Sequence, residues 1–181
     1  MKLLAIQGSL RTGSSNRKLL KVILDHLPDG VTGEIAELHD IPLFNGDVHA
    51  KGFPESVDEL RDKIRAVDFV VISVPEYNYS VSGVLKNALD WASLAPQQPF
   101  KGKPVGIVGT SSGMFGSVRA QGHVRQVLQY VEAITMPKPE VIVPQGQLKF
   151  DEAGKLTDEK TQQAVENFVA SLVLWVERFK I

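Results

Sequence analysis

Short apolar runs rich in β-branched residues alternate along the chain with stretches whose apolar residues repeat at helical spacing. The apolar runs are residues 3–6, 35–38, 69–74, 105–108 and 141–143, and the helical stretches are 17–27, 84–91, 124–131 and 165–176. This alternation predicts βαβ units and a parallel sheet. Runs 69–74 and 105–108 lack polar alternation, which is typical of strands buried on both faces.

The length of 181 residues and the hydrophobic content of 43% fit one core, and we find no internal repeat, low-complexity tract or linker. We therefore expect a single domain over residues 1–181.

Five strands in βα alternation predict a doubly wound α/β fold of strand order 2-1-3-4-5, with helices on both faces and a ligand at the switch between strands 1 and 3. In that order the loops after strands 1, 3 and 4 lie side by side at the carboxyl edge of the sheet.

Two further segments, 45–54 and 144–154, have the composition of loops. The first follows the second strand, and the sequence leaves two interpretations open for it: a flap beside the site or a solvated surface loop.

The loop after the first strand, GSLRTGSSN at residues 8–16, has the composition of an anion site. It opens a helix, where unpaired backbone N–H groups and the positive end of the helix dipole attract phosphate. Glycines allow a tight path, hydroxyl and amide side chains can donate hydrogen bonds, and an arginine adds charge; these residues are Gly8, Ser9, Arg11, Gly13, Ser14, Ser15 and Asn16.

The spacing of this loop selects the kind of phosphate. A P-loop requires Lys and Ser/Thr after its second glycine, but Ser14 and Ser15 follow Gly13 here. The G-x-G-x-x-G fingerprint of dinucleotide sites is also missing. A terminal monophosphate fits best, and the alternative is an ordinary turn in which Asn16 is only a helix cap and Arg11 is solvated.

The loops after the third and fourth strands suit a flat ligand. Pro75 ends the third strand and leaves the backbone of Glu76, Tyr77 and Asn78 facing outward, while Tyr77 or Tyr79 can cover an aromatic face. The alternative for this segment is a plain turn with partly exposed tyrosines. The fourth strand is followed by small residues that permit close approach to the backbone, namely Ser111, Ser112, Gly113 and Gly116.

Composition excludes several classes of protein. Cysteine is absent, so thiolate and iron–sulfur chemistry are excluded and redox chemistry requires a bound cofactor. The net charge of -1 disfavours a nucleic-acid partner. The four histidines are scattered and G-x-S-x-G is missing, so we expect neither a metal site nor a hydrolase triad. No apolar run approaches the roughly 18 residues of a membrane span, so we expect no membrane insertion and a cytoplasmic location.

Three segments together resemble the NADPH-dependent FMN reductase family of flavodoxin-like proteins, and within it the bacterial quinone and chromate reductase branch. They are GSLRTGSSN, PEYNYSVSGVLKNALDW and TSSGMFGSVRAQGHVRQ, which begin at residues 8, 75 and 110. The resemblance implies that the FMN phosphate is held by Ser9, Arg11, Ser15 and Asn16. It also implies that the isoalloxazine and ribityl region is lined by Pro75, Glu76, Tyr77 and Asn78, and closed on the other side by Ser111, Ser112 and Gly113.

The same resemblance implies noncovalent FMN and electron transfer from NADPH or NADH to a small-molecule acceptor: a quinone, chromate, an azo compound or free flavin. We expect ping-pong turnover without a catalytic side chain, since the flavin takes the hydride. Family members also lead us to expect a homodimer or homotetramer, with residues 79–91 and 119–130 as the candidate interface. Ser82 stands where relatives carry proline. The alternatives are a flavodoxin-type electron carrier and a non-catalytic FMN-binding module.

Overall fold

The computed structural model describes residues 1–179 and contains one parallel sheet at its centre. Its first four strands lie in the order β2 (Thr32–Ala36), β1 (Lys2–Gln7), β3 (Phe69–Ser73) and β6 (Pro104–Thr110). The fifth position is shared by β7 (Ile134–Thr135) and β8 (Val141–Val143), which both pair with β6 in parallel. The predicted strand order 2-1-3-4-5 is therefore confirmed.

The fifth strand is interrupted between its two halves. β7 pairs with the start of β6 and β8 with its end. The intervening segment contains Pro137 and Pro139, and proline has no N–H to donate to a ladder. The sequence pattern predicted only the half that became β8.

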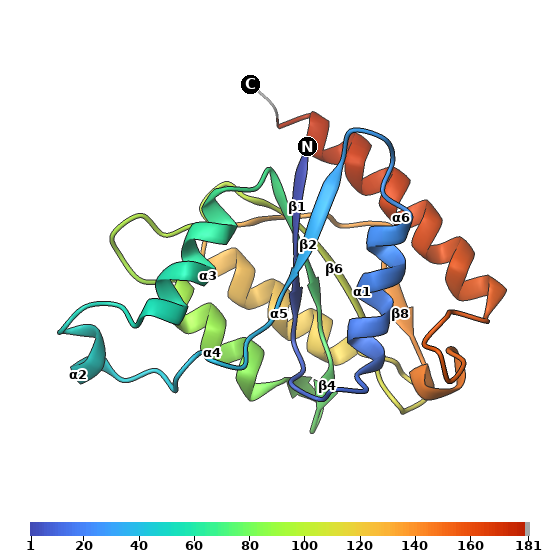
Figure 1. Ribbon diagram of the computed structural model, residues 1–181, viewed down its shortest axis with the longest axis horizontal. Coiled ribbons are helices and arrows are strands. Elements are labelled where there is room, and N and C mark those ends of the chain that lie inside the picture. The colour runs from blue at the N-terminus through green and yellow to red at the C-terminus, as the bar shows by residue number, and fades with distance from the viewer. Residues whose placement is uncertain (180–181) are drawn as a thin grey trace.

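Helices cover both faces of the sheet. Successive residues of β1 point to opposite sides, so that Leu4 and Ile6 enter one apolar cluster while Leu3 and Ala5 enter the other. One face is covered by α1 (Ser15–Asp25) and α6 (Glu159–Glu177), and the other by α3 (Glu55–Arg65), α4 (Gly83–Ala92) and α5 (Val118–Tyr130) (Figure 1). Burial on both faces explains the missing polar alternation in the strands.

The segment 45–54 packs against the body of the protein. It contains the short helix α2 (Gly46–His49), and the rings of His49 and Phe53 both lie 6.3 Å from that of Trp91. None of its residues lines the cleft described below. The interpretation as a flap beside the site is therefore not supported.

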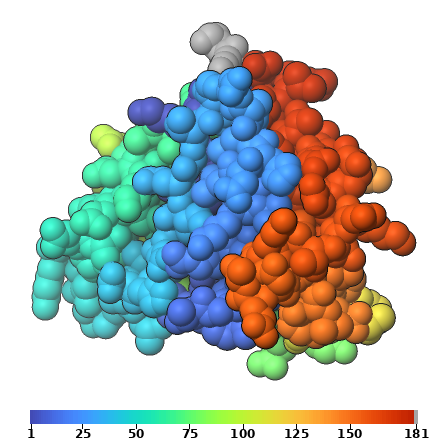
Figure 2. Space-filling view, turned by 45° about the vertical axis from the view of Figure 1, so that its right-hand side comes forward, coloured from blue at the N-terminus to red at the C-terminus, as the bar shows by residue number. Residues whose placement is uncertain are grey.

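Two small elements lie at the carboxyl edge of the sheet. A hairpin of β4 (Glu76–Tyr77) and β5 (Ser80–Val81) follows β3, and the 3-10 helix η1 (Gly146–Leu148) follows β8. In Figure 2 the blue surface of the first loop borders the orange surface of residues 144–154 along the lower edge of the molecule. Across residues 1–179 the structure contains no helix of the length and apolar character needed to cross a membrane.

Candidate functional site

A cleft of about 340 Å³ opens at the carboxyl edge, where the loops after β1, β3 and β6 meet η1. Its volume is near the lower end of the range for small-molecule sites, about 300–1,000 Å³. The lining residues are Ser9, Arg11, Ser14, Ser15, Asn16, Pro75, Glu76, Tyr77, Thr110, Ser111, Ser112 and Gln147. The expectation that these three loops lie side by side is confirmed.

Nine of the eleven predicted site residues line this cleft, and Asn78 and Gly113 do not. Asn78 lies at the tip of the hairpin in the left-handed region, with φ 49°. The N–H of Gly113 faces the Ser111 hydroxyl at 3.3 Å. Ser14, predicted as a donor of the anion loop, also lines the cleft, as do Thr110 and Gln147, which were not predicted as site residues. Ser14 and Thr110 belong to the quoted motifs, whereas Gln147 is in a segment that carried no signal beyond following the fifth strand.

The first loop depends on glycine at one of its two glycine positions. The N–H of Gly8 donates to the Ser73 carbonyl at 3.0 Å. A Cβ on Gly8 would lie 2.6 Å from that same oxygen and 2.7 Å from Cδ of Pro75. A Cβ on Gly13 would meet no atom within 4 Å. The close approach of loop one to β3 therefore requires Gly8 and not Gly13.

The start of α1 is arranged for an anion. Ser14 occupies the N-cap position, makes no side-chain cap hydrogen bond, and no acidic residue lies in the first turn. The first backbone N–H groups of a helix lack intrahelical partners. Together with the Ser14 and Ser15 side chains and the exposed Arg11 in the same cleft, they offer several donors and a positive charge.

Asn16 has a different position from the one expected. Its Nδ2 donates to the Thr110 carbonyl at 2.8 Å, and its Oδ1 accepts from the Thr110 N–H at 3.0 Å and the Ser73 hydroxyl at 2.7 Å. This buried amide connects α1 to the ends of β3 and β6. These contacts occupy Oδ1 and one of the two Nδ2 hydrogens, so the second Nδ2 hydrogen and the backbone N–H are the donors that Asn16 has left for an anion. Asn16 is not the helix cap either, since it lies inside α1.

The Glu76 carboxylate points toward α5. It accepts hydrogen bonds from the N–H groups of Arg119 at 3.0 Å and Ala120 at 3.3 Å, and it forms an ion pair with the Arg119 guanidinium at 3.1 Å. Arg119 in turn lies 4.1 Å from the ring centroid of Tyr79 and 4.7 Å from that of Phe115. Glu76 therefore joins the second loop to the start of α5 as well as lining the cleft.

The two candidate tyrosines differ in position. Tyr77 lines the cleft, is half exposed, and has its hydroxyl 3.2 Å from Oγ of Ser9. Tyr79 lies outside the cleft at the hairpin tip, with φ 68°. Tyr77 is therefore the tyrosine that can cover an aromatic ligand.

Two hydroxyl groups fix the loops around the cleft. Ser82 donates to the Gly8 carbonyl at 2.6 Å and accepts from the Leu85 N–H at 3.3 Å, so it caps α4 and holds loop one against it. Thr110 donates to the Val143 carbonyl at 2.8 Å, which ties β6 to β8 beside the cleft.

Comparison with known proteins agrees with this geometry. The chain belongs to the NADPH-dependent FMN reductase family, whose model matches residues 1–147. It is 46% identical to an NAD(P)H-dependent FMN reductase of Pseudomonas aeruginosa over 180 residues, covering 99% of this chain and 97% of the relative. It is 39% identical to the quinone reductase of Escherichia coli over 184 residues, covering 100% and 98% of the two chains.

Among solved structures, the chain is similar to FerB, a flavoenzyme NAD(P)H:acceptor oxidoreductase of Paracoccus denitrificans. The TM-score is 0.87 at 37% identity, with 99% of each chain covered. The predicted family and enzyme class are confirmed: this is an oxidoreductase family that uses FMN and NAD(P)H. The uncapped start of α1 beside Arg11 fits the FMN phosphate, and the cleft-lining Tyr77 fits its ring system.

Proposed function

We propose that this protein binds FMN noncovalently in the cleft and transfers electrons from NADPH or NADH to quinones or similar small acceptors. The observation that carries the proposal is the meeting of an uncapped helix start, Arg11 and Tyr77 in one cleft at the switch point of the sheet. The names of the relatives, quinone reductase and FMN reductase, support the same activity.

In this proposal the residues of loop one bind the phosphate. Ser9, Ser14 and Ser15 donate hydroxyl hydrogen bonds, the N–H groups at the start of α1 donate from the backbone, and Arg11 supplies the charge. The side chain of Asn16 positions the helix start through Thr110 and Ser73.

The second and third loops orient the ring. The backbone of residues 75–78 presents donors and acceptors, Tyr77 covers one part of the ring, and Ser111, Ser112 and Gly113 close the other side. FMN supplies the hydride acceptor when bound, so we assign no catalytic side chain. The protein positions the donor and acceptor at one exposed flavin face.

Steady turnover distinguishes an enzyme from an electron carrier or a binding module. The purified protein, saturated with FMN, is mixed with NADPH or NADH and a benzoquinone, and nicotinamide oxidation is followed by absorbance. We expect many turnovers per protein; a single stoichiometric reduction would support the carrier. A panel of quinone, chromate, azo dye and free flavin then identifies the preferred acceptor.

The identity of the flavin is tested independently. We expect the protein to release FMN on denaturation, because loop one offers a cradle for one phosphate and no pyrophosphate fingerprint. Chromatography that finds FAD, riboflavin or no flavin after reconstitution would contradict the proposal.

We also propose that the protein is a homodimer or homotetramer in the cytoplasm, where NAD(P)H is available. A hollow of about 350 Å³ between α4 and α5 includes Leu89, Val127 and Tyr130, and Tyr130 is 85% exposed. A second copy covering this surface would bury that ring. Sedimentation velocity of the wild type and Tyr130→Arg tests the assembly: we expect the variant to be smaller, and a monomeric wild type would contradict it. Cell fractionation tests the location.

A further inference from the structure

Three consecutive carbonyl groups of loop one are each held by a hydrogen-bond donor. The Ser9 carbonyl accepts from Nε2 of Gln7, the Leu10 carbonyl from Nε2 of His39 at 3.1 Å, and the Arg11 carbonyl from the N–H of Ser14 at 3.0 Å. Gln7 and Ser14 are local to the loop. His39 comes from the segment after β2, twenty-nine positions along the chain from Leu10.

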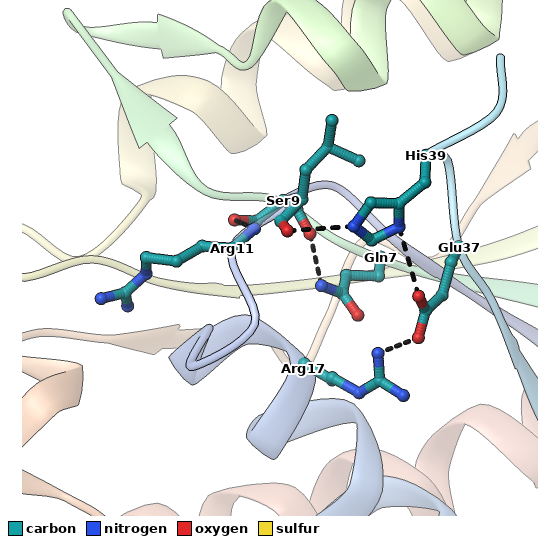
Figure 3. A network of polar contacts seen from close by, with 7 residues as sticks. Gln7, Ser9, Arg11, Arg17, Glu37 and His39 are labelled. Atoms are coloured by element: carbon teal, nitrogen blue, oxygen red, sulfur yellow. Dashed lines mark hydrogen bonds and ion pairs between the residues drawn. The ribbon is translucent and has the colours of Figure 1, made fainter.

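Figure 3 shows how this histidine is itself held. Nδ1 of His39 lies 3.2 Å from Oε2 of Glu37, and the other carboxylate oxygen of Glu37 pairs with Arg17 in the first turn of α1. A carbonyl oxygen can only accept hydrogen bonds, so Nε2 of His39 is the donor in its contact with Leu10. The network therefore connects the segment after β2, loop one and the first turn of α1.

Holding the Leu10 carbonyl determines which way the next N–H points. In a planar trans peptide the C=O and N–H groups point in opposite directions. With its carbonyl directed to His39, the Leu10–Arg11 peptide directs the Arg11 N–H to the other side, where it donates a hydrogen bond to Oγ of the cleft-lining Ser9 at 3.4 Å. A flipped peptide would instead present a carbonyl oxygen to the cleft, where it would repel an anion.

We infer that His39 is a positioning residue for the phosphate cradle: it fixes the Leu10–Arg11 peptide with its N–H toward the cleft and thereby strengthens binding of the FMN phosphate. The inference rests on the proposed function, since it concerns the same loop. It assigns a role to a side chain that lies outside the cleft and outside the three segments that carry the family resemblance, residues 8–16, 75–91 and 110–126.

The test compares two flavins that differ only in the phosphate. FMN and riboflavin are titrated into flavin-free protein, and binding is followed by flavin fluorescence for the wild type, His39→Phe and His39→Gln. We expect His39→Phe to weaken FMN about twofold to tenfold, the effect of one hydrogen bond, and to leave riboflavin unchanged. His39→Gln keeps an N–H donor and should recover most of the FMN affinity.

His26→Phe provides a matched control. The His26 ring also lies between a backbone carbonyl, Val22 at 2.7 Å, and a carboxylate, Glu166 at 3.5 Å, but at the opposite end of α1. We expect this variant to bind both flavins like the wild type. Thermal unfolding checks that each variant is folded. If phenylalanine is not tolerated at position 39, His39→Ala provides a second variant, because the His39 side chain is 46% exposed and its removal leaves no buried cavity.

The outcomes separate this inference from the proposed function. Unchanged FMN affinity in His39→Phe, or equal weakening of FMN and riboflavin, would overturn the role of His39 while the flavin site stands. A wild-type protein that binds neither flavin would overturn the proposed function, and the inference with it.

Discussion

Arg11 is the residue of loop one whose charge is available to a ligand. It is exposed at the cleft, and within residues 1–179 its guanidinium forms no ion pair, whereas Arg17 nearby is paired with Glu37. Loss of a hydrogen bond to a charged group costs about 1.5–3 kcal/mol. We therefore expect Arg11→Ala to weaken FMN binding about 10-fold to 150-fold in a fluorescence titration.

Arg178→Ala is the control for this change, because Arg178 is also exposed but directly follows α6, whose C-terminal end lies at the opposite end of the molecule from β4 (Figure 1). It should leave the FMN affinity unchanged. An Arg11→Ala titration that matches the wild type would mean that Arg11 is an ordinary solvated side chain.

At the same scale, sequence reasoning found residue types better than side-chain directions. It selected Asn16 and Glu76 correctly as cleft residues. It could not show that the Asn16 amide bonds Thr110, 94 positions away, or that the Glu76 carboxylate bonds Arg119, 43 positions away. Such partners are set by the packing of distant segments, which no local motif records.

At the scale of elements, the turn from β1 to loop one can be tested with a pair of glycines. A Cβ at Gly8 would collide with the Ser73 carbonyl and the Pro75 ring, while one at Gly13 would enter open space. We expect Gly8→Ala to destabilise the fold by about 1–3 kcal/mol, as overpacked sites do, and to weaken FMN binding. Gly13→Ala should leave urea unfolding close to that of the wild type; equal effects of the two substitutions would contradict the close approach seen at Gly8.

The start of α6 gives a pH-dependent prediction. Hydrogen bonds from the Lys149 side chain, the Thr161 hydroxyl and the Thr161 N–H lower the pKa of Asp158 from 3.8 to about 2. Asp158 caps this helix, so Asp158→Ala should cost about 0.5–2 kcal/mol of unfolding free energy at neutral pH. Because the pKa is lower in the folded state, this stabilisation is complete above about pH 4 and is lost as the pH falls toward 2.

Urea unfolding of the wild type and Asp158→Ala between pH 7 and pH 2 measures this difference. The gap between their stabilities should close on acidification. Asp29→Ala, at an exposed position, is the control and should show no such gap. A gap that stays constant to pH 2 would argue against the carboxylate as its source.

Elements buried on both faces were the easiest to predict. β3 and β6 are buried throughout and were found at nearly their observed bounds. β2 starts at Thr32, three positions before the predicted run. Its first three residues are exposed and polar or small, so the apolar pattern did not include them. The hairpin of β4 and β5 and the short β7 have two residues per strand, which is too short for any hydrophobic period to appear.

At the scale of the whole molecule, strand order made the site predictable. Parallel strands in the order 2-1-3-4-5 bring the carboxyl ends of β1, β3 and β6 together, so three loops distant in sequence could be assigned to one cleft before any contact was known. Gln147 was missed because the same edge also receives the chain after β8, whose composition resembled a surface loop.

The lining of the cleft leads to a kinetic prediction. The loops after β1, β3 and β6 line the cleft, so in the proposed complex one face of the flavin lies against these loops and one face stays open. Hydride transfer requires each reactant to lie about 3–3.5 Å from the reacting atom. NAD(P)H and the acceptor must therefore occupy the same exposed face in turn.

Double-reciprocal plots at several fixed quinone concentrations should be parallel, and each substrate in excess should inhibit competitively against the other. Intersecting lines, or a complex that holds nicotinamide and quinone at one flavin, would show that the cleft admits both at once.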